Sequence, residues 1–124
     1  MGKKNQNFVM FKGDDLVQEF LHVGPFWLTQ RQVISLEASD EINFRFHADG
    51  NPGTVHFTKT RAGGGIEVVT SGYHETNDTM RVKFDAGDTS GLPSGEYGYQ
   101  LEVVYGGSDE VVVASGVIQI SERA

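Results

Sequence analysis

The sequence predicts an all-β protein: an immunoglobulin-like antiparallel β-sandwich of about eight or nine short strands. Apolar and polar residues alternate along several segments, which is the pattern of half-buried strands. Turn-forming glycines separate these segments at the short intervals that hairpins need. A Gly/Pro/Ser-rich corner then leads into residues 97–105, the longest alternating run. A small closed barrel is the alternative arrangement of the same strands.

The corner before residues 97–105 identifies one tyrosine, Tyr97. Immunoglobulin-type sandwiches place a tyrosine here, two residues ahead of a core position, and its hydroxyl binds the backbone of the turn. We therefore expect the Tyr97 hydroxyl to bind backbone near Asp88–Leu92. In an immunoglobulin domain the core position would be cysteine, but here it is Tyr99.

The individual strands follow from the same alternation. Strong patterns predict strands at residues 42–48, 80–84 and 97–105. Weaker patterns predict strands at residues 8–12, 16–23, 33–36, 55–60 and 66–70. Residues 109–120 are expected to pair with 97–105, and their consecutive valines indicate a strand covered on both faces or a local bulge. Asp88–Leu92 is expected to form one helical turn capped by Asp88.

The register of one hairpin follows from its apolar residues. Phe46 and Phe57 must face the same core across the turn at residues 49–53, because a shift by one residue would expose one of them. If the two are directly opposite, His47 lies opposite His56 on the other face. The residues expected to face inward are Phe44, Phe46, Phe57, Val82, Phe84, Tyr99, Leu101 and Val103. Those expected to face outward are Arg45, His47 and Lys83.

Composition excludes several classes of function. The chain has 124 residues, enough for one domain with its own core. It has no cysteine, so neither disulfides nor cysteine-based metal sites or nucleophiles are expected. The net charge of −7 repels phosphate backbones, so nucleic acid is not an expected partner. No apolar run is long enough for a membrane span, and the start lacks the apolar segment of a signal peptide.

The predicted domain organisation is a short arm followed by one domain. Residues 1–7 are expected to form a flexible or partner-docking basic arm, and residues 8–121 a single immunoglobulin-like sandwich. The first strand is apolar and uncharged up to Lys12, which is unusual for a sheet edge. We therefore hypothesise that a neighbouring subunit contacts the partner-binding residues Lys3, Lys4, Phe8, Met10 and Phe11. The alternative is that this strand completes its own sheet and the arm is loose.

Candidate metal and catalytic groups are few. His47 and His56 are the best metal-ligand candidates, because cross-strand neighbours can share an ion. A third ligand is needed, for which Asp49 and Asp40 are the candidates. Two surface histidines on an exposed face are far more common, so no metal and no cofactor are expected. Acid, base and nucleophile do not converge in any motif, so the chain is not expected to be an enzyme. The run Gly63–Gly65 is read as a turn, because neither lysine nor helix follows it.

Aromatic residues allow one alternative function. Trp27, Tyr73 and Tyr105 are candidates for stacking against sugar rings in a glycan- or cell-surface-binding module. For Trp27, a half-buried aromatic side chain that closes one end of the sandwich is the more common role.

Four segments resemble, in order, small immunoglobulin-like virion proteins of tailed bacteriophages and prophages, including the N-terminal domains of baseplate upper proteins. These segments are residues 12–15 (KGDD), 34–46 (ISLEASDEINFRF), 59–68 (KTRAGGGIEV) and 88–102 (DTSGLPSGEYGYQLE). The resemblance spans most of the chain from Lys12 onward. The sequence departs from the family pattern at Ser35–Ala38, where Asp-Leu-Thr-Gly is usual, so that turn is expected to differ.

The resemblance implies a structural or adaptor component of a virion, in a tail, baseplate, neck or capsid decoration. It implies docking to other virion proteins in several copies within a symmetric assembly, and it transfers no catalytic residue. The expected location is the virion, with the protein made in the host cytoplasm.

Overall fold

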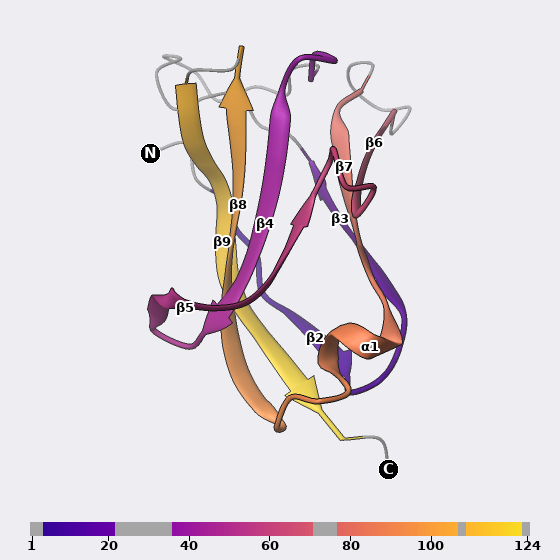
Figure 1. Cartoon of the computed structure of the whole chain (residues 1–124), viewed down its shortest axis with the longest axis vertical. Coiled ribbons are helices and arrows are strands. Elements are labelled where there is room, and N and C mark those ends of the chain that lie inside the picture. Colours follow the sequence, from indigo (N-terminus) through magenta and orange to yellow (C-terminus); the bar gives the residue numbers. More distant parts are fainter. Residues whose placement is uncertain (1–3, 22–35, 71–76, 107–108, 123–124) are drawn as a thin grey trace.

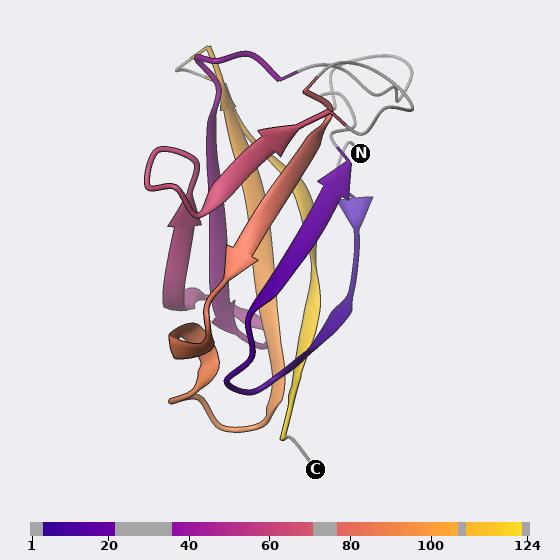
Figure 2. The same ribbon diagram turned by 90° about the vertical axis from the view of Figure 1, so that its right-hand side faces the viewer.

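The computed structural model describes residues 4–21, 36–70, 77–106 and 109–122, which form two β-sheets packed face to face (Figures 1 and 2). The larger sheet has the order β1-β9-β8-β4-β5, and β2 also pairs with β9. Its strands are β1 (Lys4–Asn5), β2 (Phe8–Phe11), β4 (Glu41–Ala48), β5 (Asn51–Thr60), β8 (Gly95–Tyr105) and β9 (Asp109–Ser121). The smaller sheet has the order β3-β7-β6, with strands β3 (Leu16–Leu21), β6 (Ile66–Val69) and β7 (Thr79–Phe84).

This strand order confirms the predicted immunoglobulin-like sandwich. The run β9-β8-β4-β5 has the order G-F-C-C′ of a variable-type immunoglobulin sheet, and β3-β7-β6 has the order B-E-D of the opposite sheet. Strand β3 covers the predicted segment as far as Leu21, and Leu36 is buried outside any strand. Residues 22–23 and 33–35 of the predicted strands lie outside the described residues.

The core occupies the space between the two sheets, as the alternation predicts. Seven of the eight predicted inward residues are buried, each with an exposed fraction of 2% or less. Phe57 is partly buried and stacks on Phe46, with 4.5 Å between ring centroids. The two are direct cross-strand partners, so the predicted register of this pair is confirmed.

An aromatic cluster lies at the position that cysteines and tryptophan occupy in antibody domains. Tyr99 of β8 stacks on Phe44 of β4 at 5.1 Å between centroids. Its ring also lies 5.6 Å from Phe20, which belongs to β3 in the opposite sheet. Because these rings come from both layers, they join the two sheets through packing where a disulfide is absent.

The hydroxyl of Tyr99 fixes the N-terminal segment. β1 and β2 both run parallel to β9, and the pairing is interrupted at Gln6 and Asn7. Tyr99 donates a hydrogen bond to the Gln6 carbonyl at 2.6 Å, and Asn7 Oδ1 accepts one from Val117 N–H at 2.8 Å. Gly116 lies opposite Tyr99, and a side chain there would collide with the Gln6 carbonyl.

These contacts correct the predicted arm. Lys4 and Asn5 belong to the sheet, because β1 pairs with β9, and Gln6 N–H also donates to the Ser115 carbonyl of β9 at 2.9 Å. Residues 1–3 lie outside the described part of the chain. Strand β2 completes its own sheet, as the alternative interpretation had it.

Two bulges shift the predicted registers. In the β4–β5 pair the register changes on both sides of His47, so His47 pairs with Val55 and the predicted His47–His56 pair is wrong. His47 points to the outer face, where it lies over Gly98, but it is buried there rather than exposed, with an exposed fraction of 6%. In the β8–β9 pair a shift falls between Leu101 and Glu102, which confirms the bulge suggested by the consecutive valines.

The single helical turn, α1 (Ala86–Thr89), begins earlier than predicted. Its N-cap is Asp85 rather than Asp88. Asp88 is the third residue of the helix (N3), and its carboxylate accepts a hydrogen bond from the Asp85 backbone N–H at 2.7 Å. This is the reciprocal bond of a capping box. The predicted turn at Gly63–Gly65 is present, with Gly64 at φ 83°.

Tyr97 is a tyrosine corner. Its side chain is buried, with an exposed fraction of 8%, and its hydroxyl donates to the Pro93 carbonyl at 2.6 Å. The acceptor directly follows Leu92, so the expected bond to backbone near Asp88–Leu92 is confirmed. The bond stabilises the connection from β7 in the smaller sheet to β8 in the larger sheet.

Replacing Tyr97 by phenylalanine removes this hydrogen bond and keeps the ring. The free energy of unfolding should fall by about 1 kcal/mol, with the fold unchanged. Urea denaturation of Tyr97→Phe and wild type measures the difference. An unchanged midpoint would mean that the corner bond does not stabilise the fold.

Candidate interaction surface

The outward side of β2 is apolar. Alternation points Phe8 and Met10 into the core, where Met10 is buried and Phe8 lies 5.6 Å from the Tyr99 ring. Val9 and Phe11 point outward, with exposed fractions of 58% and 50%. Of the proposed contact strand Phe8–Phe11, Val9 and Phe11 are therefore accessible and Met10 is not.

A shallow depression lies beside this strip. It has a volume of about 380 Å³ and is lined by Asn7, Phe8, Val9, Glu96, Val117 and Gln119. Val9 is the direct cross-strand partner of Gln119. The apolar surface therefore continues from β2 onto the outer face of β9.

Among the described residues, the backbone of β2 pairs with another strand on one side only, towards β9. The N–H groups of Gln6 and Lys12 donate to carbonyls of β9 at 2.9 and 2.8 Å. Since the direction of backbone groups alternates along a strand, the even-numbered residues face β9 and Val9 and Phe11 face the open edge. Val9 thus presents an exposed apolar side chain and backbone groups at the open edge, whereas the Phe11 carbonyl already accepts the Asp14 N–H at 3.1 Å.

The end of this strip is held in place by the C-terminal end of β9. Lys12 Nζ lies 3.4 Å from a Glu122 carboxylate oxygen, and Ser94 Oγ donates to the same oxygen at 2.9 Å. The Ser94 hydrogen bond and the nearby Lys12 lower the pKa of Glu122. The strand is therefore presented in a fixed position relative to β9.

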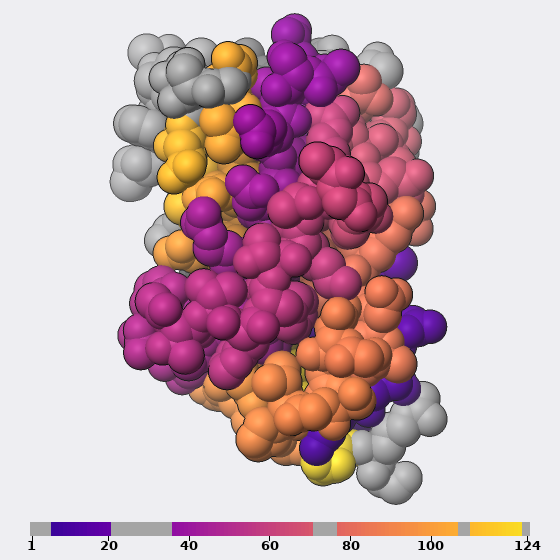
Figure 3. All heavy atoms as spheres, viewed as in Figure 1, coloured from indigo at the N-terminus to yellow at the C-terminus, as the bar shows by residue number. Residues whose placement is uncertain are grey.

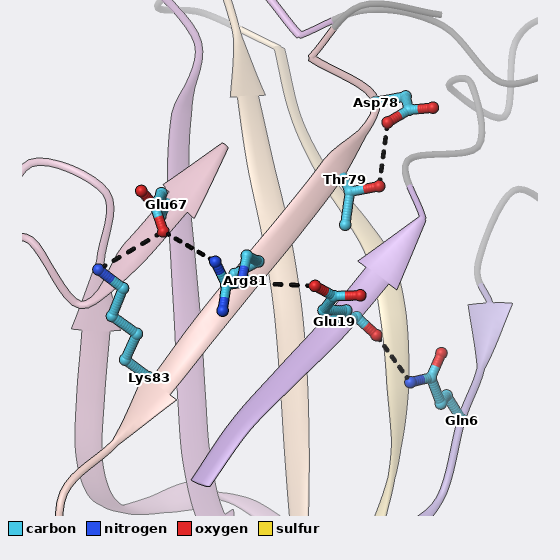
Figure 4. Close-up of polar contacts among 7 residues, drawn as sticks. All are labelled: Gln6, Glu19, Glu67, Asp78, Thr79, Arg81 and Lys83. Carbon is cyan, nitrogen blue, oxygen red and sulfur yellow. Dashed lines mark hydrogen bonds and ion pairs between the residues drawn. The ribbon is translucent and has the colours of Figure 1, made fainter. Parts of the chain in front are cut away.

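The outer face of the smaller sheet is charged instead. Arg81 of β7 lies between Glu19 of β3, at 3.4 Å, and Glu67 of β6, at 3.5 Å, while Lys83 lies 3.6 Å from Glu67 (Figure 4). Gln6 Nε2 donates to the Glu19 carbonyl at 3.1 Å, so the N-terminal segment also contacts β3. The partly exposed charges on this face are hydrated and mutually paired, which makes it a poor apolar docking surface.

The outer face of the larger sheet contains a buried ion pair. Glu102 of β8 is 2% exposed, and both its oxygens bind the Arg45 guanidinium, at 2.8 and 2.9 Å. Asn43 Nδ2 donates to it at 3.4 Å. The space-filling view shows the residues of β5 spread across the lower part of the molecule on this side (Figure 3). Alternation in the sequence predicts that Arg45 faces outward, but no pattern in the sequence marks Glu102 as its ion-pair partner.

The two candidate metal ligands do not form a site. His47 lies over Gly98, its cross-strand partner, where a side chain would collide with the imidazole. Its Nδ1 is 2.7 Å from the Ala48 carbonyl, and the exposed His56 instead packs edge-on to Tyr97 at 5.4 Å. Within the described ranges, histidine and carboxylate side chains form no group of three or more that could hold a metal.

The remaining predicted site residues are only partly described. Trp27, Tyr73 and Lys3 lie outside the described residues, and Lys4 forms part of β1. Tyr105 is partly buried against the core, and burial together with the Asp40 charge raises its pKa. One aromatic residue of the proposed glycan-stacking set is thus placed, and it is not fully accessible.

Comparisons with known proteins give little beyond the fold. No protein-family model matches the chain, and no curated protein matches it. Among solved structures it is similar to Drosophila OTK, extracellular domains 3-5, at 14% identity and a TM-score of 0.35. That alignment covers 97% of this chain and 33% of the other, so the chain spans about a third of its length. No helix in the described part is long and apolar enough to cross a membrane.

The buried ion pair gives a second prediction. Arg45→Met leaves the Glu102 carboxylate buried without its cation and should lower the free energy of unfolding by about 2–3 kcal/mol, discounted because Arg45 is partly exposed. The matched control Arg81→Met, whose partners are exposed, should cost less than about 1 kcal/mol.

The double variant Arg45→Met/Glu102→Met removes both charges and should recover much of the lost stability, because a buried pair is often replaceable by apolar residues. Chemical denaturation of all four proteins measures these differences. Equal losses in Arg45→Met and Arg81→Met would contradict the prediction.

Proposed function

We propose that this chain is a structural or adaptor component of a tailed-phage virion that acts by protein–protein docking in a symmetric assembly. The observation that carries docking is the edge of β2, where Val9 and Phe11 expose apolar side chains and where, within the described part of the chain, β9 is the one strand paired with β2. Isolated proteins usually protect a sheet edge with charge, proline or a bulge. An edge without such protection favours a partner that covers it.

The assignment to a virion rests on the resemblance of the four sequence segments. In the structure two of them build the framework: the turn at Gly63–Gly65 joins β5 to β6, and Tyr97 anchors the corner before β8. These two segments therefore support the immunoglobulin-like sandwich fold. The role within a tail, baseplate, neck or capsid decoration is what we propose. Other virion proteins, met in several copies, are the proposed partners, because repeated contacts of modest affinity add up in a symmetric particle.

The test is to ask whether the chain is part of a particle. Phage particles from the organism that encodes the chain are purified on a density gradient and analysed by quantitative mass spectrometry. The proposal expects the chain to band with capsid and tail proteins at a constant copy number. Particles that lack the chain, with specific binding of the purified protein to a glycan array, would overturn the proposal in favour of a glycan-binding module.

A further inference from the structure

The outer face of the larger sheet has an apolar strip with little charge. Val117, Gly98, His47 and Val55 are cross-strand partners in turn, on β9, β8, β4 and β5. Val9 of β2 lines the same depression as Val117, and Val9 and Val55 are two of the four exposed large apolar residues in the described part of the chain. The centres of protein interfaces are poor in charge, so this face has the composition of a docking surface.

The free charges on this face are all negative. Arg45 and Glu102 neutralise one another at its centre. Glu96 lies near one end of β8, while Glu41 and Glu110 lie on either side of Val104 near the other end. These three carboxylates are exposed and form no ion pair within the described residues. The charge of the face therefore favours a cationic partner.

Glu96 differs from the other two carboxylates because it borders the depression of about 380 Å³ beside β2. Its cross-strand partner Gln119 lines the same depression, together with Val9 and Val117. Apolar walls with a carboxylate at the rim suit a long cationic side chain, whose stem packs on apolar surface while its charged head stays in water. Arginine suits this site best, because its weakly hydrated guanidinium has donors for both the carboxylate and the Gln119 amide oxygen.

We infer that this depression binds an arginine side chain of a neighbouring protein, which docks on the outer face of the larger sheet. The guanidinium pairs with Glu96, and the stem lies between Val9 and Val117. The inference deepens the docking function proposed above, on which it rests, by naming the face and the chemistry of the partner's contact residue.

The arginine belongs to a different protein rather than to a second copy of this chain. The arginines in the described part of the chain are already bound to carboxylates or carbonyls of their own chain: Arg45, Arg61 and Arg81. Two copies, each with a net charge of −7, also repel one another. A basic partner is attracted instead, so the contact should weaken as the salt concentration rises.

A nuclear magnetic resonance titration of the isolated, isotope-labelled protein tests the site. The probe is N-acetyl-arginine amide, and its control is N-acetyl-citrulline amide, which is similar in shape but uncharged. The arginine amide should shift the backbone signals of residues 9, 96, 117 and 119. It should also bind about threefold more tightly than the citrulline amide, a ratio typical of an exposed ion pair. High salt should remove the difference.

Two variants distinguish this site from general attraction to an acidic protein. Glu96→Gln should abolish the preference for the arginine amide. Glu110→Gln removes the same charge near the other end of the face and should keep the preference. Both side chains are exposed, so neither change should affect folding, which circular dichroism checks.

A second measurement follows the chain in particles. Glu96→Lys places a cation where the partner's arginine binds, and it should lower the copy number of the chain about threefold or more. Glu110→Lys makes the same change of charge outside the depression and should keep the wild-type copy number.

Equal binding of the two amides, or an unchanged preference in Glu96→Gln, would overturn the inference. Self-association of the isolated chain that Val9→Lys abolishes would also overturn it, because the face would then bind a second copy. A wild-type copy number of Glu96→Lys in particles would refute the arginine contact and leave the role in the virion standing. If the arginine amide binds as predicted but the chain is absent from particles, the arginine site stands and the virion role falls.

Discussion

The contact of Tyr99 with rings from both sheets is the interaction on which this fold depends. Its ring stacks on Phe44 of the same sheet and packs near Phe20 of the other, and its hydroxyl binds the Gln6 carbonyl. An immunoglobulin domain joins its sheets here with a disulfide. A buried aromatic cluster instead needs no oxidising environment, and the polar tip of tyrosine satisfies a backbone group that the interrupted β1–β2 pairing leaves without a ladder partner.

The position of β2 follows from this contact. Tyr99 and Gly116 contact the interruption at Gln6 and Asn7, which keeps the register with β9 unchanged; beyond it, Phe8 and Met10 point inward and Val9 and Phe11 outward. Met10 and Phe8 then fill the core, which holds the strand against β9. The same arrangement leaves an apolar strand at the open edge of the larger sheet. One four-residue strand thus contributes side chains both to the core and to the proposed docking edge.

Alternation in the sequence was sufficient to predict the sandwich, the tyrosine corner, the Phe46–Phe57 pair and nearly all of the core. It failed where extra residues change the register, because no periodic pattern marks a bulge: His47 was placed opposite His56 for this reason. Contacts between segments far apart in the chain were also missed, such as Arg45 with Glu102 and Gln6 with Tyr99. The apolar character of β2 was evident, but only its partner β9 determines which residues remain exposed.

Amide hydrogen exchange of Tyr99→Phe tests the account most directly. This substitution keeps the ring cluster and removes the hydrogen bond to Gln6. The account predicts that protection falls in β2 and in the facing residues 115–121 of β9, while the β4–β8 pairing keeps its protection. Tyr97→Phe serves as the control, because its hydroxyl binds the Pro93 turn and not the N-terminal segment. Unchanged protection of β2, or an equal loss in both variants, would contradict the claim that Tyr99 positions this strand.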